Sequence, residues 1–442
     1  MTASVNRFWE SVSKSTSRTR WVLAAMTALQ VLWLGVIWAT GAASNARKIP
    51  FLIVYTLIVG TLAQVLPLRV ESWWNRWIEA LAPRRRRVIA GLVLVGGIAG
   101  CIYAHYQNVL TDEGYLLQAS GIIADRGVRA FFSGYSEIKW LGGQHPPLIP
   151  LIYGSAMRIV GTRLLPLRAI AVLVTTGTVV LTYRLGEAWF DPVTGLLAAF
   201  LFVSMPYCLR MGTAVLTDMP VTFLFLLGVF LIQQLPARRS FGLASLAGVV
   251  IGLGLLSKYT MFLIYPVLAL HCIAQKRMRQ VPAQLALSIL VSLLVFGAWM
   301  TFAYARGIFG RQVETVTHYA GMVVRGGWMY MVEMLSTELT SAVGLYNLPV
   351  LFLGVIASLR QRLESDLSLL LWIVAVFAAV TLTLPDPRYF MPMFPALAIA
   401  MARGTRTFRL SESRIIMLAL LLAGGALCLF ADWYRAAFLF LQ

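Results

Sequence analysis

Residues 88–115 read VIAGLVLVGGIAGCIYAHYQNVLTDEGY, an apolar run of membrane-spanning length followed by an acidic pair, Asp112 and Glu113. A third acidic residue, Asp218, stands at the start of another apolar run. Asp and Glu together number only 18 in 442 residues. Carboxylates at a bilayer boundary cost desolvation free energy and are seldom kept there without a partner or a function. These three acids are therefore the first candidates for a functional site; the alternative is that they are solvated span ends.

The composition excludes an ordinary soluble domain. Hydrophobic residues make up 59% of the chain and charged residues 12%, whereas soluble domains are about half apolar. We therefore expect an all-α polytopic membrane protein. The net charge of +19 is explained by basic cytoplasmic loops that face anionic lipid head groups, so no nucleic-acid partner is expected. The four cysteines show no paired spacing and are expected to be packing residues.

Hydropathy predicts about 13 transmembrane helices, because a crossing needs about 20 apolar residues and shorter runs can cross when tilted or broken. The runs lie at 21–40, 50–67, 88–106, 164–185, 192–209, 218–235, 241–256, 259–274, 282–305, 342–359, 367–384, 389–402 and 414–431. Placing the N-terminus in the cytoplasm puts most basic loops inside, as the positive-inside rule requires. Residues 1–87 are then expected to hold two extra helices and a basic amphipathic cytoplasmic segment, and residues 88–442 the core.

One apolar stretch, Pro146–Gly161, would reverse this orientation if it crossed the membrane. It is short, starts with two prolines and carries Arg158, so we expect a helix at the outer interface instead. Residues 107–163 then form one long outer segment, and residues 306–340, rich in glycine and aromatic residues, form a second. We expect no separate soluble domain.

Polar residues collect at the outer ends of the predicted spans. After the acidic pair come Gln144-His145-Pro146-Pro147, Asp218, Lys258-Tyr259 and Asp386-Pro387-Arg388-Tyr389. The order and spacing of these motifs, with RYFMPMFPA at 388–396, resemble the family C glycosyltransferase superfold. Within it, the pattern is most similar to bacterial relatives of protein O-mannosyltransferases and of lipid A aminoarabinose transferases. The resemblance covers about residues 88–405 and implies that residues 88–442 are a catalytic core.

The resemblance implies roles for the two acidic positions. Asp112 would be the general base, with Glu113 as its orienting neighbour, and Asp218 would place the acceptor or bind a cation. The alternative for the Asp112–Glu113 pair is a helix cap or a solvated pair. For Asp218 it is an N-cap of the following helix, a role that can coexist with a function.

The resemblance also implies a donor-phosphate site. Lys258, Tyr389 and Arg388 would hold the phosphate, since a guanidinium beside a phenol is a good phosphate clamp. The alternatives are that Lys258 extends to water and that Arg388 forms a surface pair with Asp386. His145 would donate to the phosphate as an imidazolium, or it is a neutral structural donor.

The chain departs from the aminoarabinose transferase pattern at two positions. His145 stands where that family has Lys, and Gln144 stands where it has Glu. Metal binding through that Glu cannot be carried over, so no cofactor is certain and a divalent metal stays an open alternative.

The resemblance implies an inverting glycosyltransferase, a hexosyl- or pentosyltransferase, that uses a polyprenyl-phosphate-linked sugar as donor. The acceptor is expected to be a lipid or glycan hydroxyl in preference to a protein. The expected location is the bacterial inner membrane, multi-pass, with the active site on the outer face. The alternatives are a polytopic lipid or glycan transporter and a non-catalytic membrane scaffold.

Overall fold

The computed structural model describes residues 80, 83–138, 145–311, 313–314, 317, 339–344, 347–383 and 386–407. All of its regular structure in these ranges is helical. The longer helices are α4 (Arg85–Tyr106), α5 (Thr111–Ser133), α7 (Leu148–Val160), α8 (Leu164–Trp189), α9 (Pro192–Ser204), α11 (Asp218–Gln233), α13 (Phe241–Ser257), α14 (Ile264–Ala274), α15 (Pro282–Ala305), α18 (Leu348–Gln361), α19 (Glu364–Thr383) and α20 (Phe394–Thr407).

Short helical segments join the long helices. They are η2 (Tyr135–Glu137), α10 (Pro206–Gly212), α12 (Leu235–Arg238), η3 (Tyr259–Leu263), η4 (Lys276–Gln280), α17 (Thr340–Val343) and η7 (Pro387–Met393).

The predicted spans correspond to helices wherever the chain is described. The first two runs and the last one, with residues 1–79, lie outside the described residues. Each of the other runs falls on a helix or on two consecutive helical segments. In the described part, five helices are long and apolar enough to cross a membrane, or six if the bent α9–α10 pair is one span. The chain is a multi-pass membrane protein.

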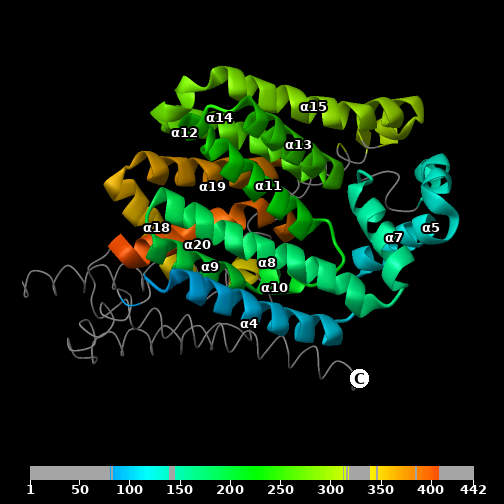
Figure 1. Cartoon of the computed structure of the whole chain (residues 1–442), viewed down its shortest axis with the longest axis horizontal. Helices are drawn as coiled ribbons and strands as arrows, with labels where there is room; N and C mark the ends of the chain where they lie inside the picture. Colours follow the sequence, from blue (N-terminus) through cyan, green and yellow to red (C-terminus); the bar gives the residue numbers. More distant parts are fainter. Residues whose placement is uncertain are drawn as a thin grey trace, which may run out of the picture.

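The bundle is built in layers. Helices α4, α8, α11, α13 and α15 pack side by side in that order, and α9, α18 and α20 pack together behind α8 (Figure 1). The α13–α15 contact is close: a Cβ at Gly248 or Gly252 would lie 2.6 Å from Ser288 O or from Val295 Cβ, respectively. Small residues allow helix backbones to approach in this way.

Helices α5 and α7 form a separate unit at one end of the bundle (Figure 1). They pack on each other. A Cβ at Gly154 of α7 would lie 2.6 Å from Ile123 Cβ of α5. Helix α7 has 13 residues, about 20 Å at 1.5 Å per residue, which is short of the hydrocarbon thickness of about 30 Å. The expectation that Pro146–Gly161 forms a helix too short to be a full crossing agrees with these dimensions.

Candidate active site

The acidic pair begins helix α5, and its two carboxylates point to different partners. Asp112 and Glu113 lie in the first helical turn, where negative charge is favoured by the helix dipole. The Leu110 backbone N–H donates to Glu113 Oε2 at 3.2 Å, which fixes the start of the helix. Asp112 is a quarter exposed and pairs with Arg388, whereas Glu113 is fully buried and pairs with Arg168. Glu113 was expected to orient Asp112; its carboxylate is instead bound to another arginine.

Asp218 and Lys258 form a buried ion pair, with 2.5 Å between Lys258 Nζ and Asp218 Oδ1. Asp218 is the first residue of α11, and Thr217 holds the N-cap position. Lys258 has extended backbone between the end of α13 and the start of η3. Its ammonium also lies 4.2 Å from the centroid of the Tyr389 ring, a cation–π distance. Lys258 is 5% exposed and therefore does not extend to water.

Arg388 bridges Asp112 to Asp386. Its Nη1 contacts Asp112 Oδ2, and its Nη2 donates to Asp386 Oδ2 at 3.0 Å. Asp386 also accepts the Arg388 backbone N–H at 2.9 Å, which starts the η7 helix. Burial raises the pKa of Asp386, but the hydrogen bonds and charge of Arg388 outweigh it and hold that pKa below its usual value. The Asp386–Arg388 pair, which was the alternative for Arg388, is present, and it extends to Asp112, the expected base.

His145 lies just before α7 and is buried. Its backbone carbonyl accepts the Tyr135 hydroxyl at 2.6 Å. Burial, and then the nearby charges of Lys258 and Arg388, hold the pKa of His145 well below its usual value. Of the two interpretations of this residue, the neutral one agrees with its surroundings. Gln144 lies outside the described residues.

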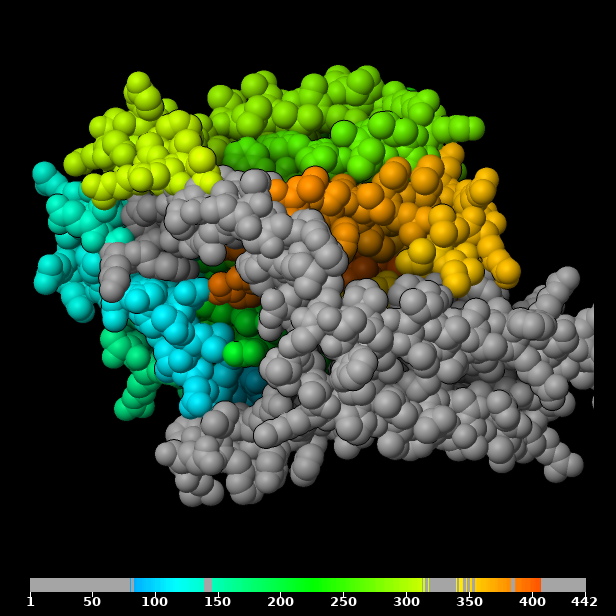
Figure 2. Space-filling view, turned by 180° about the vertical axis from the view of Figure 1, so that it is seen from behind, coloured from blue at the N-terminus to red at the C-terminus, as the bar shows by residue number. Residues whose placement is uncertain are grey.

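The predicted site residues converge, although they come from five separate parts of the chain. Asp218 acts electrostatically on Arg388, and Lys258 and Arg388 both act on His145. Together with the contacts above, this places all seven predicted residues in one region or directly beside it. From behind, the cyan surface of α5 borders a recess in which green and orange residues from later in the chain are visible (Figure 2).

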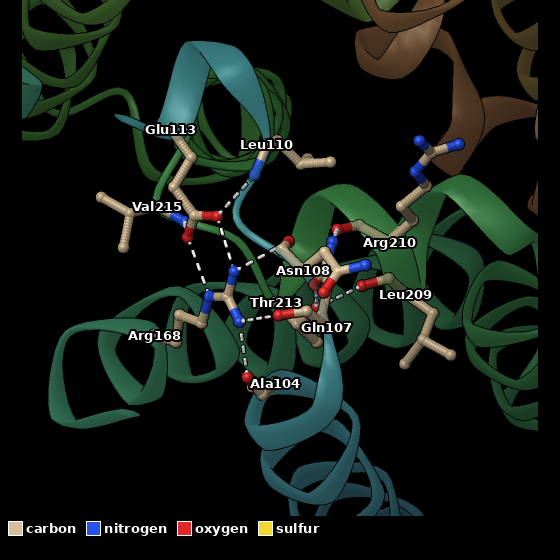
Figure 3. Close-up of polar contacts among 10 residues, drawn as sticks. All are labelled: Ala104, Gln107, Asn108, Leu110, Glu113, Arg168, Leu209, Arg210, Thr213 and Val215. Carbon is tan, nitrogen blue, oxygen red and sulfur yellow. Dashed lines mark hydrogen bonds and ion pairs between the residues drawn. The ribbon is translucent and has the colours of Figure 1, made fainter. Parts of the chain in front are cut away.

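A residue that the sequence reasoning missed lies beside this region. Arg168, on α8, is fully buried and donates to both oxygens of Glu113, at 2.9 Å from Nε and 2.6 Å from Nη2. Its other bonds go to backbone carbonyls in the last turn of α4 and in the segment that follows it (Figure 3), namely those of Ala104, Gln107 and Asn108. The signal in the sequence was a charged residue inside the apolar run 164–185, which is rare unless the residue has a partner.

The described residues contain no group of three or more His, Cys, Asp and Glu side chains placed to hold a metal ion. Asp112 and Asp218 are each bound to a cationic side chain instead.

Comparison with known proteins identifies the fold. A family model described as dolichyl-phosphate-mannose-protein mannosyltransferase matches residues 144–302. The crystal structure of ArnT from Cupriavidus metallidurans bound to undecaprenyl phosphate aligns with a TM-score of 0.57 at 16% identity, covering 76% of this chain and 63% of that one. The chain has the family C glycosyltransferase fold. The expected resemblance to protein mannosyltransferases and to lipid A aminoarabinose transferases is thereby confirmed as a similarity of fold and of part of the sequence.

Two further proteins are similar to this chain, the first in its fold and the second in part of its sequence. The oligosaccharyltransferase of Archaeoglobus fulgidus in its apo form aligns with a TM-score of 0.53 at 12% identity, covering 78% of this chain and 56% of that one. The undecaprenyl phosphate-alpha-4-amino-4-deoxy-L-arabinose arabinosyl transferase of Pseudomonas paraeruginosa is 28% identical over 265 residues, which is 56% of this chain. The chain spans about half, 47%, of the length of this curated relative.

Proposed function

We propose that this protein is an inverting glycosyltransferase that moves a sugar from a polyprenyl-phosphate donor to a hydroxyl group of a lipid or glycan. The observation that carries the proposal is the meeting of Asp112, Asp218, Lys258, Arg388 and Tyr389 at one place. It supplies a partly exposed carboxylate beside two cations, which are the groups that this reaction needs.

Asp112 is the base of the proposed reaction. Its carboxylate is 24% exposed, so an acceptor hydroxyl can reach it. Asp112 takes the proton as the hydroxyl oxygen forms a bond to the anomeric carbon. The bond from that carbon to the phosphate oxygen breaks, and its electron pair leaves with polyprenyl phosphate. A single displacement of this kind inverts the anomeric configuration.

Lys258, Arg388 and Tyr389 bind the departing phosphate in this proposal, with neutral His145 beside them. Two of the five N–H donors of Arg388 make no hydrogen bond within the described part of the chain. These donors and the exposed edge of the guanidinium are available to an anion. A phosphate with two or more charged oxygens matches a fixed guanidinium well.

Arg388 also links donor binding to the base. The same guanidinium contacts Asp112, so a phosphate that binds Arg388 competes with Asp112 for it. A carboxylate that loses an opposite charge becomes a stronger base. Donor binding therefore makes Asp112 a stronger base for proton transfer. The negative charge of the donor phosphate also acts on the buried Asp218–Lys258 pair.

The comparisons support transfer over transport, because the relatives named above are transferases. The ArnT structure is a complex with undecaprenyl phosphate, which supports a polyprenyl phosphate carrier, and the arabinosyl transferase supports a pentose as the first sugar to test. We further propose a catalytic core at 88–442, with the site on the outer face of a bacterial inner membrane and the N-terminus in the cytoplasm.

The proposed base is tested with Asp112→Asn in the purified full-length chain. The probes are undecaprenyl-phosphate-linked pentose and hexose, with a membrane lipid extract as acceptor. Wild-type protein is expected to release undecaprenyl phosphate in step with glycosylation of the extract. The variant is expected to lose about 100- to 10,000-fold in rate, the usual contribution of a general base.

Asp125→Asn is the matched control, because Asp125 is an exposed carboxylate on the same helix. It is expected to keep full activity. Full activity of Asp112→Asn would remove Asp112 from the mechanism. Movement of the donor without release of undecaprenyl phosphate would indicate a transporter.

A further inference from the structure

Arg168 joins the two chain segments that carry the acidic residues of the site. Glu113 follows Asp112 directly in the first turn of α5, and Val215 precedes Asp218 by three residues. Glu113 Oε1 accepts hydrogen bonds from Arg168 Nε and from the Val215 backbone N–H, each at 2.9 Å. One carboxylate oxygen therefore connects α5, α8 and the segment before α11.

A second set of bonds runs beside the first (Figure 3). Gln107 Nε2 donates to the Arg210 carbonyl at 2.9 Å, and the Thr213 hydroxyl donates to Gln107 Oε1 at 2.6 Å. The Gln107 carbonyl accepts from Arg168 Nη1 at 2.6 Å. Gln107, between α4 and α5, is thus bound to α10 and to the segment that follows α10. Arg168 is bonded to Gln107 and, through Glu113, to Val215 in that same segment.

We infer that Arg168 is a positioning residue that holds Asp112 and Asp218 in register, while making no contact with substrate itself. This inference rests on the proposed function. All five N–H donors of Arg168 are used inside the protein, so none is left for a phosphate. The side chain is also fully buried.

The chemistry of this cluster requires arginine. A guanidinium presents five donors in a fixed plane, whereas an ammonium has three donors around one point. Lysine at position 168 would keep the charge but lose at least two of the five bonds. Because Arg168 and Glu113 are fully buried, a Glu113 oxygen that loses its donor would be left unsatisfied, and the two segments would move relative to each other. A displacement of about 1 Å at reacting groups costs about 100-fold in rate.

Arg168→Lys in the full-length protein tests this role. At saturating donor, kcat is expected to fall about 100-fold. The KM for the undecaprenyl-phosphate-linked sugar is expected to stay within about threefold, because Lys258 and Arg388 are unchanged. Hydrogen exchange at residues 213–218 is expected to speed up, since the Val215 N–H loses its fixed acceptor.

Arg403→Lys is the matched control for general destabilisation. Arg403, in helix α20, pairs with the buried Asp366 at 3.2 Å. The first nine residues of α20, 394–402, separate it from the end of η7 beside the site. It is expected to lower thermal stability comparably while leaving kcat unchanged. Thr213→Val, a smaller change in the same network, is expected to lower kcat about tenfold, and it decides the matter if Arg168→Lys does not fold.

The outcomes separate this inference from the proposed function. Unchanged kcat in Arg168→Lys, or equal losses in Arg168→Lys and Arg403→Lys, would overturn the positioning role. If the wild type transfers no sugar, the proposed function fails, and hydrogen exchange at 213–218 still tests the link. Exchange that is unchanged in both Arg168→Lys and Thr213→Val would show that Arg168 does not hold this segment.

Discussion

Arg168 and Arg388 differ in how many of their guanidinium N–H donors are hydrogen-bonded within the protein. Arg168 is fully buried, and its five donors all reach protein oxygens. Arg388 is 27% exposed, contacts Asp112 and Asp386, and keeps donors that no described residue accepts. Both arginines bind a member of the same acidic pair.

The difference shows how one residue type can serve either structure or chemistry. A buried guanidinium whose donors are all hydrogen-bonded cannot take a ligand, and removing it leaves a buried carboxylate without its partner. A partly exposed one costs little to remove, because solvent screens the charges that it leaves behind. We therefore expect substitutions at Arg168 to act on stability and, through the position of the acidic residues, on transfer, whereas substitutions at Arg388 act on transfer with little change in stability.

The largest effect is expected from Arg168→Leu, which strands the Glu113 carboxylate in the protein interior. Loss of one partner of a buried pair lowers the free energy of unfolding by about 3–5 kcal/mol. Unfolding in mixed detergent micelles measures it. A loss below about 1 kcal/mol would mean that the cluster is no stronger than a surface pair, and the contrast with Arg388 would disappear.

The next largest effect is expected from Arg388→Gln, measured as the rate of sugar transfer. Removing a charged donor from a developing anion costs about 100- to 1,000-fold, while the free energy of unfolding changes by about 1 kcal/mol or less. Arg306→Gln, at an exposed arginine that ends α15, is the control and should be fully active. An Arg388→Gln protein that transfers normally but unfolds easily would reverse the two roles.

A smaller effect is expected from Gln107→Leu, which tests the edge of the Arg168 cluster. The change leaves the Thr213 hydroxyl and the Arg210 carbonyl without the side-chain partner seen in the structure. The Thr213 hydroxyl keeps the Leu209 carbonyl as an acceptor and Arg210 is exposed. Each lost hydrogen bond therefore costs about 0.5–1.5 kcal/mol, so stability should drop measurably but less than in Arg168→Leu. Similar losses in the free energy of unfolding in the two variants would mean that the stability of the cluster depends on Gln107 as much as on Arg168.

The smallest effect is a pH dependence of stability from His145. Its pKa is lowered in the folded protein, so below about pH 6.5 the unfolded chain binds a proton that the folded chain does not. The free energy of unfolding should therefore fall as the pH is lowered below that value, by at most about 1.4 kcal/mol per pH unit. His145→Gln should remove this part of the slope. An unchanged slope would mean that folding does not lower the pKa of His145.

The sequence indicated most of the site because charged residues are scarce in such a chain. Asp112, Lys258 and Arg388 stood out at the ends of apolar runs. Their partners could not be assigned, since Arg388 meets Asp112 across 276 positions and only the packing of the bundle brings them together. Arg168 was overlooked because it lies within a run counted as one span.

The predicted helices were correct in position across the described residues, but their continuity was not always predictable. The run 192–209 was expected as one element, and the structure bends it by 68° between α9 and α10. Pro206 is the first residue of α10, and a proline disfavours helical backbone in the residue before it. Hydropathy reports how apolar a segment is and contains no information about such a bend.

The close seam between α13 and α15 has a consequence for donor choice. With Ser288 and Val295 packed on its glycines, α13 cannot slide along its neighbour, so Lys258 at its end is a fixed point of the proposed phosphate site. Arg388 lies instead in the short 3₁₀ helix η7, which begins at Pro387 and contains Pro392. Adaptation to a bulkier or smaller sugar head group must then come from the η7 side of the site, and substitutions around 386–393 are where altered sugar preference should be sought.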